Sequence, residues 1–329
     1  MSKLWPSRFA ARMHFLRLCL KNRGLFERVL ENPKAGALVG SVLNDPAAER
    51  LIDCILHDQP FFAACVRRRG DLMLCADNAL PAPPDETDPR KAGVTPELRA
   101  RYADIVEEPF WEIAHKCLPY TMLLVERLYD IYKAIEYVCR HNIEGDIVEC
   151  GVALGGAVMT AAETLVHFQS TERKVYLYDT FAGMTPPGAH DFDLFGNDCS
   201  TMDPAALYWT DGSLYERTRK NLRLCRYPYD RFVFVKGPVE ETLPGVLPDK
   251  IAYLRLDTDF YEPTKQELVH LFPRLVPGGV ITIDDYGHYL GARKATDEYF
   301  ATCPDQVLLH RVDYTGRTGV KLVSGAMAA

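Results

Sequence analysis

Carboxylates follow two apolar segments in the second half of the chain. Asp257 and Asp259 come at the end of one apolar run, and Asp284 and Asp285 come at the end of the next. If both runs are neighbouring strands of a parallel sheet, their carboxyl ends bring Asp257, Asp284 and Asp285 towards one point, with Asp259 nearby. Acids so close together repel one another and take up protons unless a cation lies among them. Three such oxygen donors suit Mg²⁺ or another hard divalent ion, so we predict a metal site; the alternative is a rim of solvated charges and helix caps.

A histidine lies close behind these acids. His288 comes shortly after Asp285, at the same predicted edge of the sheet. A neutral imidazole at this place is able to take a proton from a substrate hydroxyl, which makes His288 a candidate catalytic base. The alternative is a surface histidine without a chemical role.

An earlier acid, Glu149, stands at the end of another predicted strand and is followed by glycines. Gly151 comes first, and Gly155 and Gly156 complete a Gly-x-x-x-Gly-Gly pattern. Such a turn lets the backbone pass close to a ligand and then begin a helix. The spacing differs from that of a dinucleotide site, and a carboxylate at the turn opposes a pyrophosphate but suits a ligand with a cationic end. A tight turn without any ligand is the alternative.

Candidate contacts to a nucleoside follow the next two predicted strands. Asp179, in the run Tyr-Leu-Tyr-Asp-Thr-Phe that ends at Phe181, stands where these folds hold a ribose through its hydroxyls. A lone acid there also serves as a helix cap or turn former. Gly237 and Val239 follow the third strand, where a base edge is able to rest against the backbone.

The elements that must position these residues alternate between strands and helices. Apolar residues of the segment 124–138 step by four, three, four and three, which predicts one buried helix face. Thr121 and Met122 precede this helix and either cover a ligand or pack in the core. The predicted strands are 145–151, 175–178, 232–235, 252–256 and 280–283, and the predicted helices between them are 157–168, 214–224 and 264–275. We therefore expect an α/β fold with a doubly wound, Rossmann-like parallel sheet, closed at one edge by an antiparallel hairpin from 307–312 and 320–323.

The chain is expected to divide into a helical N-terminal region, a linker and a larger domain. Residues 1–78 show short amphipathic runs, residues 79–95 have the proline-rich, charged composition of an exposed linker, and residues 96–329 carry all the motifs above. We expect a homo-oligomer, and the N-terminal region is one candidate for its contacts.

Composition excludes several classes of protein. A formal net charge of −7 gives no basic field for nucleic acid, and no apolar run reaches signal-peptide or membrane-spanning length. The ten cysteines have irregular spacing without a Cys-x-x-Cys pair, which favours reduced thiols in a cytoplasmic protein. A Gly-x-Ser-x-Gly elbow and a P-loop are absent from the sequence, so a serine hydrolase or a P-loop kinase is not expected.

Taken in order, these motifs resemble those of the macrocin O-methyltransferase family. The resemblance covers roughly Cys117 to Phe300, and the segments that carry it are Pro119–Met122, Gly145–Val152, Tyr178–Met184, Leu254–Tyr261 and Ile283–Tyr286. It implies a class I methyltransferase fold and an enzyme that uses S-adenosylmethionine and Mg²⁺ to methylate sugar hydroxyls of antibiotics and related natural products.

The resemblance also implies roles for single residues. Glu149 and Gly151 would line the methionine end of S-adenosylmethionine, and Asp179 would bind its ribose. Asp257, Asp284 and Asp285 would hold Mg²⁺, with Asp257 next to the cofactor and also a candidate base. The partner would be a small acceptor that contains a sugar.

The sequence departs from the family pattern after the first glycine. Ala153, Leu154 and Ala157 stand where the family commonly has an aromatic residue, an arginine and a serine. A methyltransferase acting on a catechol-like phenol and a binding protein that kept the fold without catalysis are alternative hypotheses. The glycine spacing and the acid cluster disfavour a nicotinamide dehydrogenase.

Overall fold

The fold is seen in a computed structural model that describes residues 93–201, 212–305 and 307–322. The chain divides into two compact units, residues 1–75 and 76–329, and all the described residues belong to the second. The predicted helical region 1–78 and the predicted linker up to residue 92 lie outside the described residues. The last linker residues already contact the folded part, since the amide of Val94 donates to Nδ1 of His115 at 3.1 Å.

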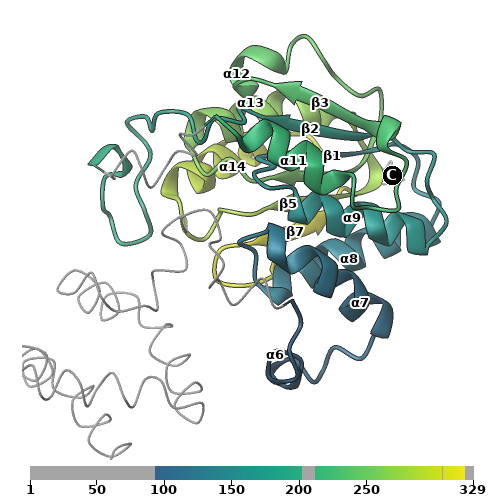
Figure 1. The fold of residues 1–329 in the computed structure, drawn as a ribbon. Helices are drawn as coiled ribbons and strands as arrows, with labels where there is room; N and C mark the ends of the chain where they lie inside the picture. Colours follow the sequence, from purple (N-terminus) through teal and green to yellow (C-terminus); the bar gives the residue numbers. More distant parts are fainter. Residues whose placement is uncertain (1–92, 202–211, 306, 323–329) are drawn as a thin grey trace, which may run out of the picture. The chain divides into compact units, whose positions relative to one another are not determined.

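A seven-stranded sheet forms the centre of this unit (Figure 1). Its strands are β1 (Asp146–Cys150), β2 (Val175–Asp179), β3 (Phe232–Lys236), β4 (Ile251–Leu256), β5 (Leu275–Ile283), β6 (His310–Arg311) and β7 (Arg317–Val320). The order across the sheet is β3-β2-β1-β4-β5-β7-β6. The first five strands are parallel, and β7 runs antiparallel to both β5 and β6. The predicted doubly wound sheet with an antiparallel edge hairpin is confirmed.

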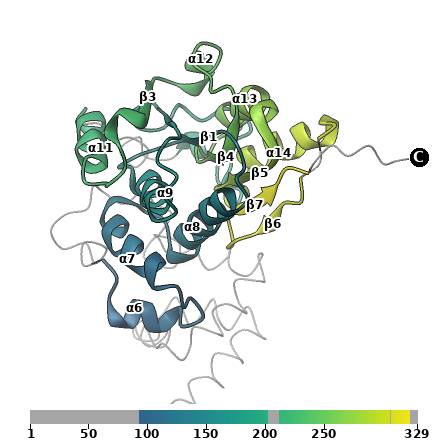
Figure 2. The same cartoon turned by 90° about the vertical axis from the view of Figure 1, so that its right-hand side faces the viewer.

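Helices cover both faces of the sheet (Figure 2). The helices are α6 (Pro96–Arg101), α7 (Glu108–Cys117), α8 (Val125–Arg140), α9 (Gly156–His167), α11 (Leu214–Leu222), α12 (Val239–Thr242), α13 (Tyr261–Leu271) and α14 (Leu290–Thr302). Short 3₁₀ turns are η4 (Leu118–Tyr120), η5 (Cys199–Thr201), η6 (Tyr229–Arg231) and η7 (Phe272–Arg274). One apolar core joins α7, α8 and α9 to the sheet and a second joins α13 to its other face, because successive strand residues point to opposite sides.

Several boundaries differ from the predicted ones, and three of them matter for the site or the hairpin. Leu124 is not part of the buried helix face: it is the N-cap of α8 and is 42% exposed. The helix expected to end at residue 275 stops at Leu271, because Pro273 cannot continue it and β5 begins at Leu275. The last strand begins at Arg317 rather than Val320, which leaves a tighter turn in the hairpin.

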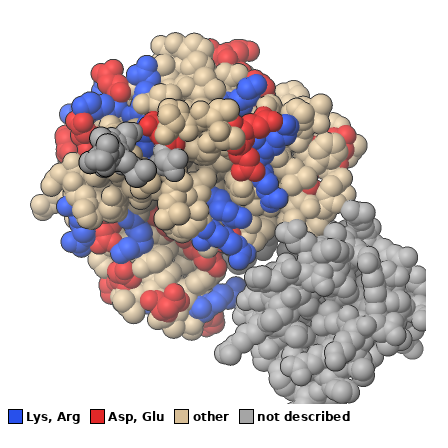
Figure 3. Space-filling view, turned by 180° about the vertical axis from the view of Figure 1, so that it is seen from behind, with Lys and Arg blue, Asp and Glu red and all other residues tan. Residues whose placement is uncertain are grey.

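Two further expectations concern the surface and the thiols. In residues 93–201, 212–305 and 307–322, no helix is long and apolar enough to cross a bilayer. The six cysteines of these ranges are all free thiols, and Cys117, Cys150 and Cys199 are buried. Basic and acidic side chains are interspersed on the face in Figure 3.

Candidate active site

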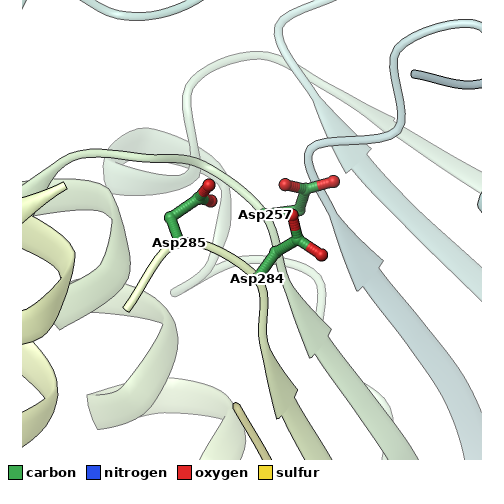
Figure 4. Close-up of side chains that lie close together, drawn as sticks. All are labelled: Asp257, Asp284 and Asp285. Atoms are coloured by element: carbon green, nitrogen blue, oxygen red, sulfur yellow. The ribbon is translucent and has the colours of Figure 1, made fainter. Parts of the chain in front are cut away.

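The acids predicted to meet do meet at the carboxyl ends of β4 and β5. Asp257 directly follows β4, and Asp284 and Asp285 directly follow β5, its parallel neighbour. One carboxylate oxygen from each lies within 4.8 Å of one from each of the others. Figure 4 shows the carboxylates of Asp257 and Asp284 close together, with Asp285 facing them. This spacing allows one small cation to contact all three side chains.

Arg255, a residue that the sequence motifs did not single out, lies between the acids. It is on β4, only 1% exposed, and beside Glu149 of β1 in the strand register. Its Nη1 donates to Oε1 of Glu149 at 2.8 Å and to Oδ2 of Asp257 at 2.5 Å, and its Nη2 donates to Asp284. A guanidinium therefore already neutralises part of the charge that we expected a metal ion to balance.

A second guanidinium reaches the cluster from α8. Arg127 donates to Oδ2 of Asp284 and, at 2.7 Å, to Oδ2 of Asp313 in the turn between β6 and β7. Burial works to raise the pKa of Asp284, but Arg127 and Arg255 outweigh it and hold that pKa below its ordinary value. Asp284 is thus an ionised and rigidly held carboxylate.

The charge on the other side of the cluster is not compensated in this way. Asp285 is 7% exposed, and its Oδ2 has no hydrogen-bond partner among the described residues. Burial and the charges of Asp259 and Asp257 raise the pKa of Asp285 well above its usual value. Burial and Asp257 likewise raise the pKa of Asp259 to about 7. A buried carboxylate oxygen with no donor and several acidic neighbours is what a cation site requires.

A cavity of about 860 Å³ connects these acids with the predicted cofactor residues. It extends along the carboxyl ends of the strands, from the turn after β3 past β1 and β4 to the segment after β5. Of the predicted site residues, those in its wall are Thr121, Met122, Glu149, Gly151, Asp179, Gly237, Val239, Asp257, Asp284, Asp285 and His288. The volume is in the range typical of small-molecule and cofactor sites.

Two of the predicted cofactor residues are not in the cavity wall. Gly155 is the N-cap of α9, and a Cβ there would point at Thr218 and Leu222 of α11. Phe181 is 2% exposed, and its ring contacts Tyr215 and Phe234. In this structure both residues support the loops around the cavity.

Asp179 shapes the turn after β1 as well as the cavity. Its Oδ2 accepts hydrogen bonds from the amides of Val152 and Ala153 at 2.6 and 2.9 Å, and its Oδ1 accepts one from the amide of Phe181 at 2.5 Å. The alternative of a turn-forming acid is therefore correct for this side chain. It also lies in the cavity wall, and its contact with a ribose stays a prediction.

His288 lies in the wall of the cavity near the acids and is 9% exposed. Its ring contacts the rings of Phe195, Tyr289 and Tyr314. Burial lowers the pKa of His288 to about 4. The imidazole is consequently neutral at pH 7, as a base must be, but a weak proton acceptor.

The buried role of Arg255 could have been predicted from the sequence, whereas that of Arg127 could not. Arg255 is the one charge in the buried strand Ile-Ala-Tyr-Leu-Arg-Leu, which is a usable signal that it has buried partners. Arg127 lies in the first turn of a helix with ordinary amphipathic spacing, and no local pattern marks it.

Comparison with known proteins agrees with this geometry. The family model described as macrocin-O-methyltransferase (TylF) matches residues 101–318. A tetracenomycin-rhamnoside 4'-O-methyltransferase of Streptomyces olivaceus is 34% identical over 205 residues, which cover 61% of this chain and 69% of that protein. Mycinamicin III 3''-O-methyltransferase of Micromonospora griseorubida is 30% identical over 193 residues, 58% of this chain and 72% of that protein.

A solved structure is also similar. The structure of the O-methyltransferase NovP superposes with a TM-score of 0.54 at 28% identity, covering 62% of this chain and 83% of that one. The sheet, the order of the motifs and these matches together show that the chain is an O-methyltransferase that belongs to the macrocin O-methyltransferase family.

Proposed function

We propose that this enzyme transfers a methyl group from S-adenosylmethionine to a sugar hydroxyl of a glycosylated natural product, with Mg²⁺ bound by Asp257, Asp284 and Asp285. The observation that carries the proposal is one continuous cavity, which has most of the predicted cofactor residues along its wall and the acid cluster at one end. The names of the tetracenomycin and mycinamicin relatives support an acceptor of this class.

The residues present fit both groups. For the ion, three carboxylates converge within 4.8 Å, and Oδ2 of Asp285 is buried without a donor among the described side chains. For the cofactor, the wall follows β3, β2 and β1 in turn through Gly237, Asp179 and Glu149. This order lets the base, the ribose and the methionine end lie along the edge of the sheet.

The bound groups supply an electrophilic methyl and a metal ion that lowers the pKa of the acceptor hydroxyl. The chain itself holds the acids in place: Arg255 fixes Asp257 and Asp284, and Arg127 fixes Asp284 from the opposite side. Positioning of this kind keeps the acceptor oxygen aligned with the methyl and supplies much of the acceleration.

A side chain of the cluster must also accept the hydroxyl proton. Asp257 and His288 are the predicted bases, and Asp259 lies beside them in the cavity wall. We favour a carboxylate over the imidazole, because burial lowers the pKa of His288 to about 4. A base works best when its pKa lies near the working pH.

The acceptor is expected to enter beyond the acids, next to α6. The hydroxyl of Tyr102, which follows α6, donates to Glu126 at 3.0 Å, and the adjacent Arg127 contacts Asp284. Leu98 of α6 and the exposed Leu124 line the cavity there, which suits the apolar part of a glycoside.

A homo-oligomer and a cytoplasmic location remain predictions.

The test is methyl transfer from labelled S-adenosylmethionine to a panel of glycosides and catechols, with Mg²⁺ or with excess EDTA. Asp257→Ala and Asp285→Asn should each abolish turnover because they remove a ligand of the ion, while calorimetry shows nearly unchanged cofactor affinity. Asp249→Asn, at an exposed acid away from the cavity, is the control and should keep full activity. Full activity of both cluster variants in EDTA would rule the scheme out, and methylation of catechols alone would change the acceptor class.

A further inference from the structure

The turn between β6 and β7 contacts the segment that carries two of the three proposed metal ligands. The hydroxyl of Thr315 donates to the carbonyl oxygen of Asp284 at 2.7 Å, and the amide of Gly287 donates to the carbonyl oxygen of Thr315 at 2.8 Å. A Cβ on Gly287 would lie 1.9 Å from the carbonyl oxygen of Tyr314, so the two segments pack closely. The turn of the edge hairpin therefore supports the acid cluster.

Asp313 joins this turn to a basic side chain of the cluster. Its Oδ1 accepts hydrogen bonds from the amides of Thr315 and Gly316 at 2.9 and 2.6 Å, which shapes the turn. Its Oδ2 accepts one from Nε of Arg127 at 2.7 Å, and Nη1 of the same guanidinium donates to Oδ2 of Asp284. The side chains of Arg127 and Asp313 are only 12% and 10% exposed, so water screens this chain of ion pairs weakly.

The charge of Arg127 is thus divided between two carboxylates. Asp284 also accepts a hydrogen bond from Arg255 through Oδ1, so each of its two oxygens has a guanidinium partner. A carboxylate whose charge is balanced by two guanidiniums attracts a metal ion less strongly. Asp313 balances part of the charge of Arg127 and so leaves Asp284 a better ligand, as outer partners of metal ligands commonly do.

We propose that Asp313 is a positioning residue, which acts through Arg127 to keep Asp284 available to the metal ion. This assignment rests on the proposed function, because it needs Mg²⁺ among Asp257, Asp284 and Asp285. Without the charge of Asp313, the guanidinium of Arg127 would pair with Asp284 alone, and its positive charge would repel the ion more strongly. The expected consequence is weaker binding of Mg²⁺.

The experiment is calorimetric titration of the full chain with Mg²⁺ in the presence of S-adenosylhomocysteine. Asp313→Asn keeps an acceptor for the turn amides but loses the charge, and should weaken Mg²⁺ binding about 10- to 100-fold. Asp313→Ser is a second variant, whose hydroxyl also accepts from turn amides, and it should weaken the ion to a similar extent. The matched control is Asp305→Asn, which removes the acid that pairs with Lys321 and should change the affinity less than about threefold.

A double-mutant cycle tests whether Asp313 acts through the guanidinium. In the Arg127→Gln protein that route is absent, so adding Asp313→Asn should change the Mg²⁺ affinity by less than about threefold. The affinity for S-adenosylhomocysteine should stay the same in all variants, whereas a general loss of structure would lower it.

Wild-type Mg²⁺ affinity in both Asp313 variants would overturn the assignment while the proposed function stands. An undiminished loss in the Arg127→Gln background would overturn it as well. Failure of the wild type to bind Mg²⁺ at all would overturn both the assignment and the proposed metal site.

Discussion

Arg255 shows how single residues decide the charge of the site. Its guanidinium has contacts with Glu149, Asp257 and Asp284 and is 1% exposed. Buried ion pairs contribute little net stability when intact, but breaking one leaves unpaired charge in a medium of low polarity. The planar guanidinium of Arg255 donates hydrogen bonds to acids on both of its sides at once, and the single ammonium group of a lysine cannot do this.

We therefore expect Arg255→Lys to destabilise the protein although it keeps the charge. The loss should be about 1–3 kcal/mol in the free energy of unfolding, measured by urea denaturation. The matched control is Arg140→Lys in the exposed pair with Glu136, where the arginine side chain is 62% exposed and the change should stay below about 0.5 kcal/mol. Equal losses of stability from the two substitutions would mean that the guanidinium geometry of Arg255 does not contribute to stability.

The convergence of the acids could be predicted from the sequence, but their arginine partners could not, for a physical reason. Asp257, Asp284 and Asp285 each follow an apolar strand, so their convergence depends only on the strands being parallel neighbours. The partners of Arg255 depend on the register that sets it beside Glu149, which no local pattern in the chain specifies.

His288 gives a second prediction at this scale, through stability rather than catalysis. Its pKa falls from 6.5 in an exposed chain to about 4 in the fold, so the unfolded state binds more protons between these values. Stability is therefore present above pH 6.5 and is lost as the pH falls towards 4. Between pH 7 and pH 5 the wild type should lose about 2 kcal/mol more than His288→Gln, measured by urea denaturation at both values. Parallel pH profiles of the two proteins would contradict the buried neutral imidazole.

At the scale of elements, the distance between strand ends is set by the loops that follow them. Gly151 directly follows β1 and has a φ of +83°, and a Cβ on it would lie 1.8 Å from the carbonyl oxygen of Asp257. Gly151, which was predicted to let the backbone approach a ligand, thus also lets the backbone after β4 pass close to the end of β1. This contact keeps Glu149 within reach of Arg255 and Asp257.

Gly151→Ala should consequently be much more harmful than an alanine at another left-handed glycine. Gly196 has a similar φ of +79°, but a Cβ on it would meet nothing within 4 Å, so Gly196→Ala carries only the conformational cost of about 1–2 kcal/mol. We expect Gly151→Ala to lose more than about 4 kcal/mol or to fail to fold, as judged by urea denaturation and circular dichroism. If both variants are equally stable, the close approach is not rigid.

Secondary structure was more predictable than the position of its ends. The five parallel strands follow from apolar runs, and α8 follows from a buried stripe of Leu128, Ile131, Ile135 and Val138. Leu124 fits the same spacing yet precedes the helix and lines the cavity, because periodicity does not locate the first turn.

At the scale of the whole molecule, all the described residues of the cavity wall belong to one compact unit. Every described residue in the cavity wall lies between Gly93 and Thr315, within the unit 76–329. The family match begins only at residue 101, although Thr95, Glu97 and Leu98 of the cavity wall precede it. The α6 segment is therefore a part of the site that the family pattern does not describe.

The fragment 76–329 should fold by itself and bind S-adenosylhomocysteine within about threefold of the full chain, because it retains the described sheet, both cores and the cavity wall.

The comparison is the shorter fragment 103–329, which lacks α6 and the contacts of Val94, Leu98 and Tyr102 with the core. Its unfolding temperature should be lower by roughly 2–8 °C, since it loses packing worth one or two kilocalories per mole. Thermal unfolding and calorimetry on both fragments provide the measurement. Loss of binding or of cooperative unfolding in 76–329 would show that residues 1–75 contribute to the cofactor site, and equal unfolding temperatures would show that α6 is not an integral part of the domain.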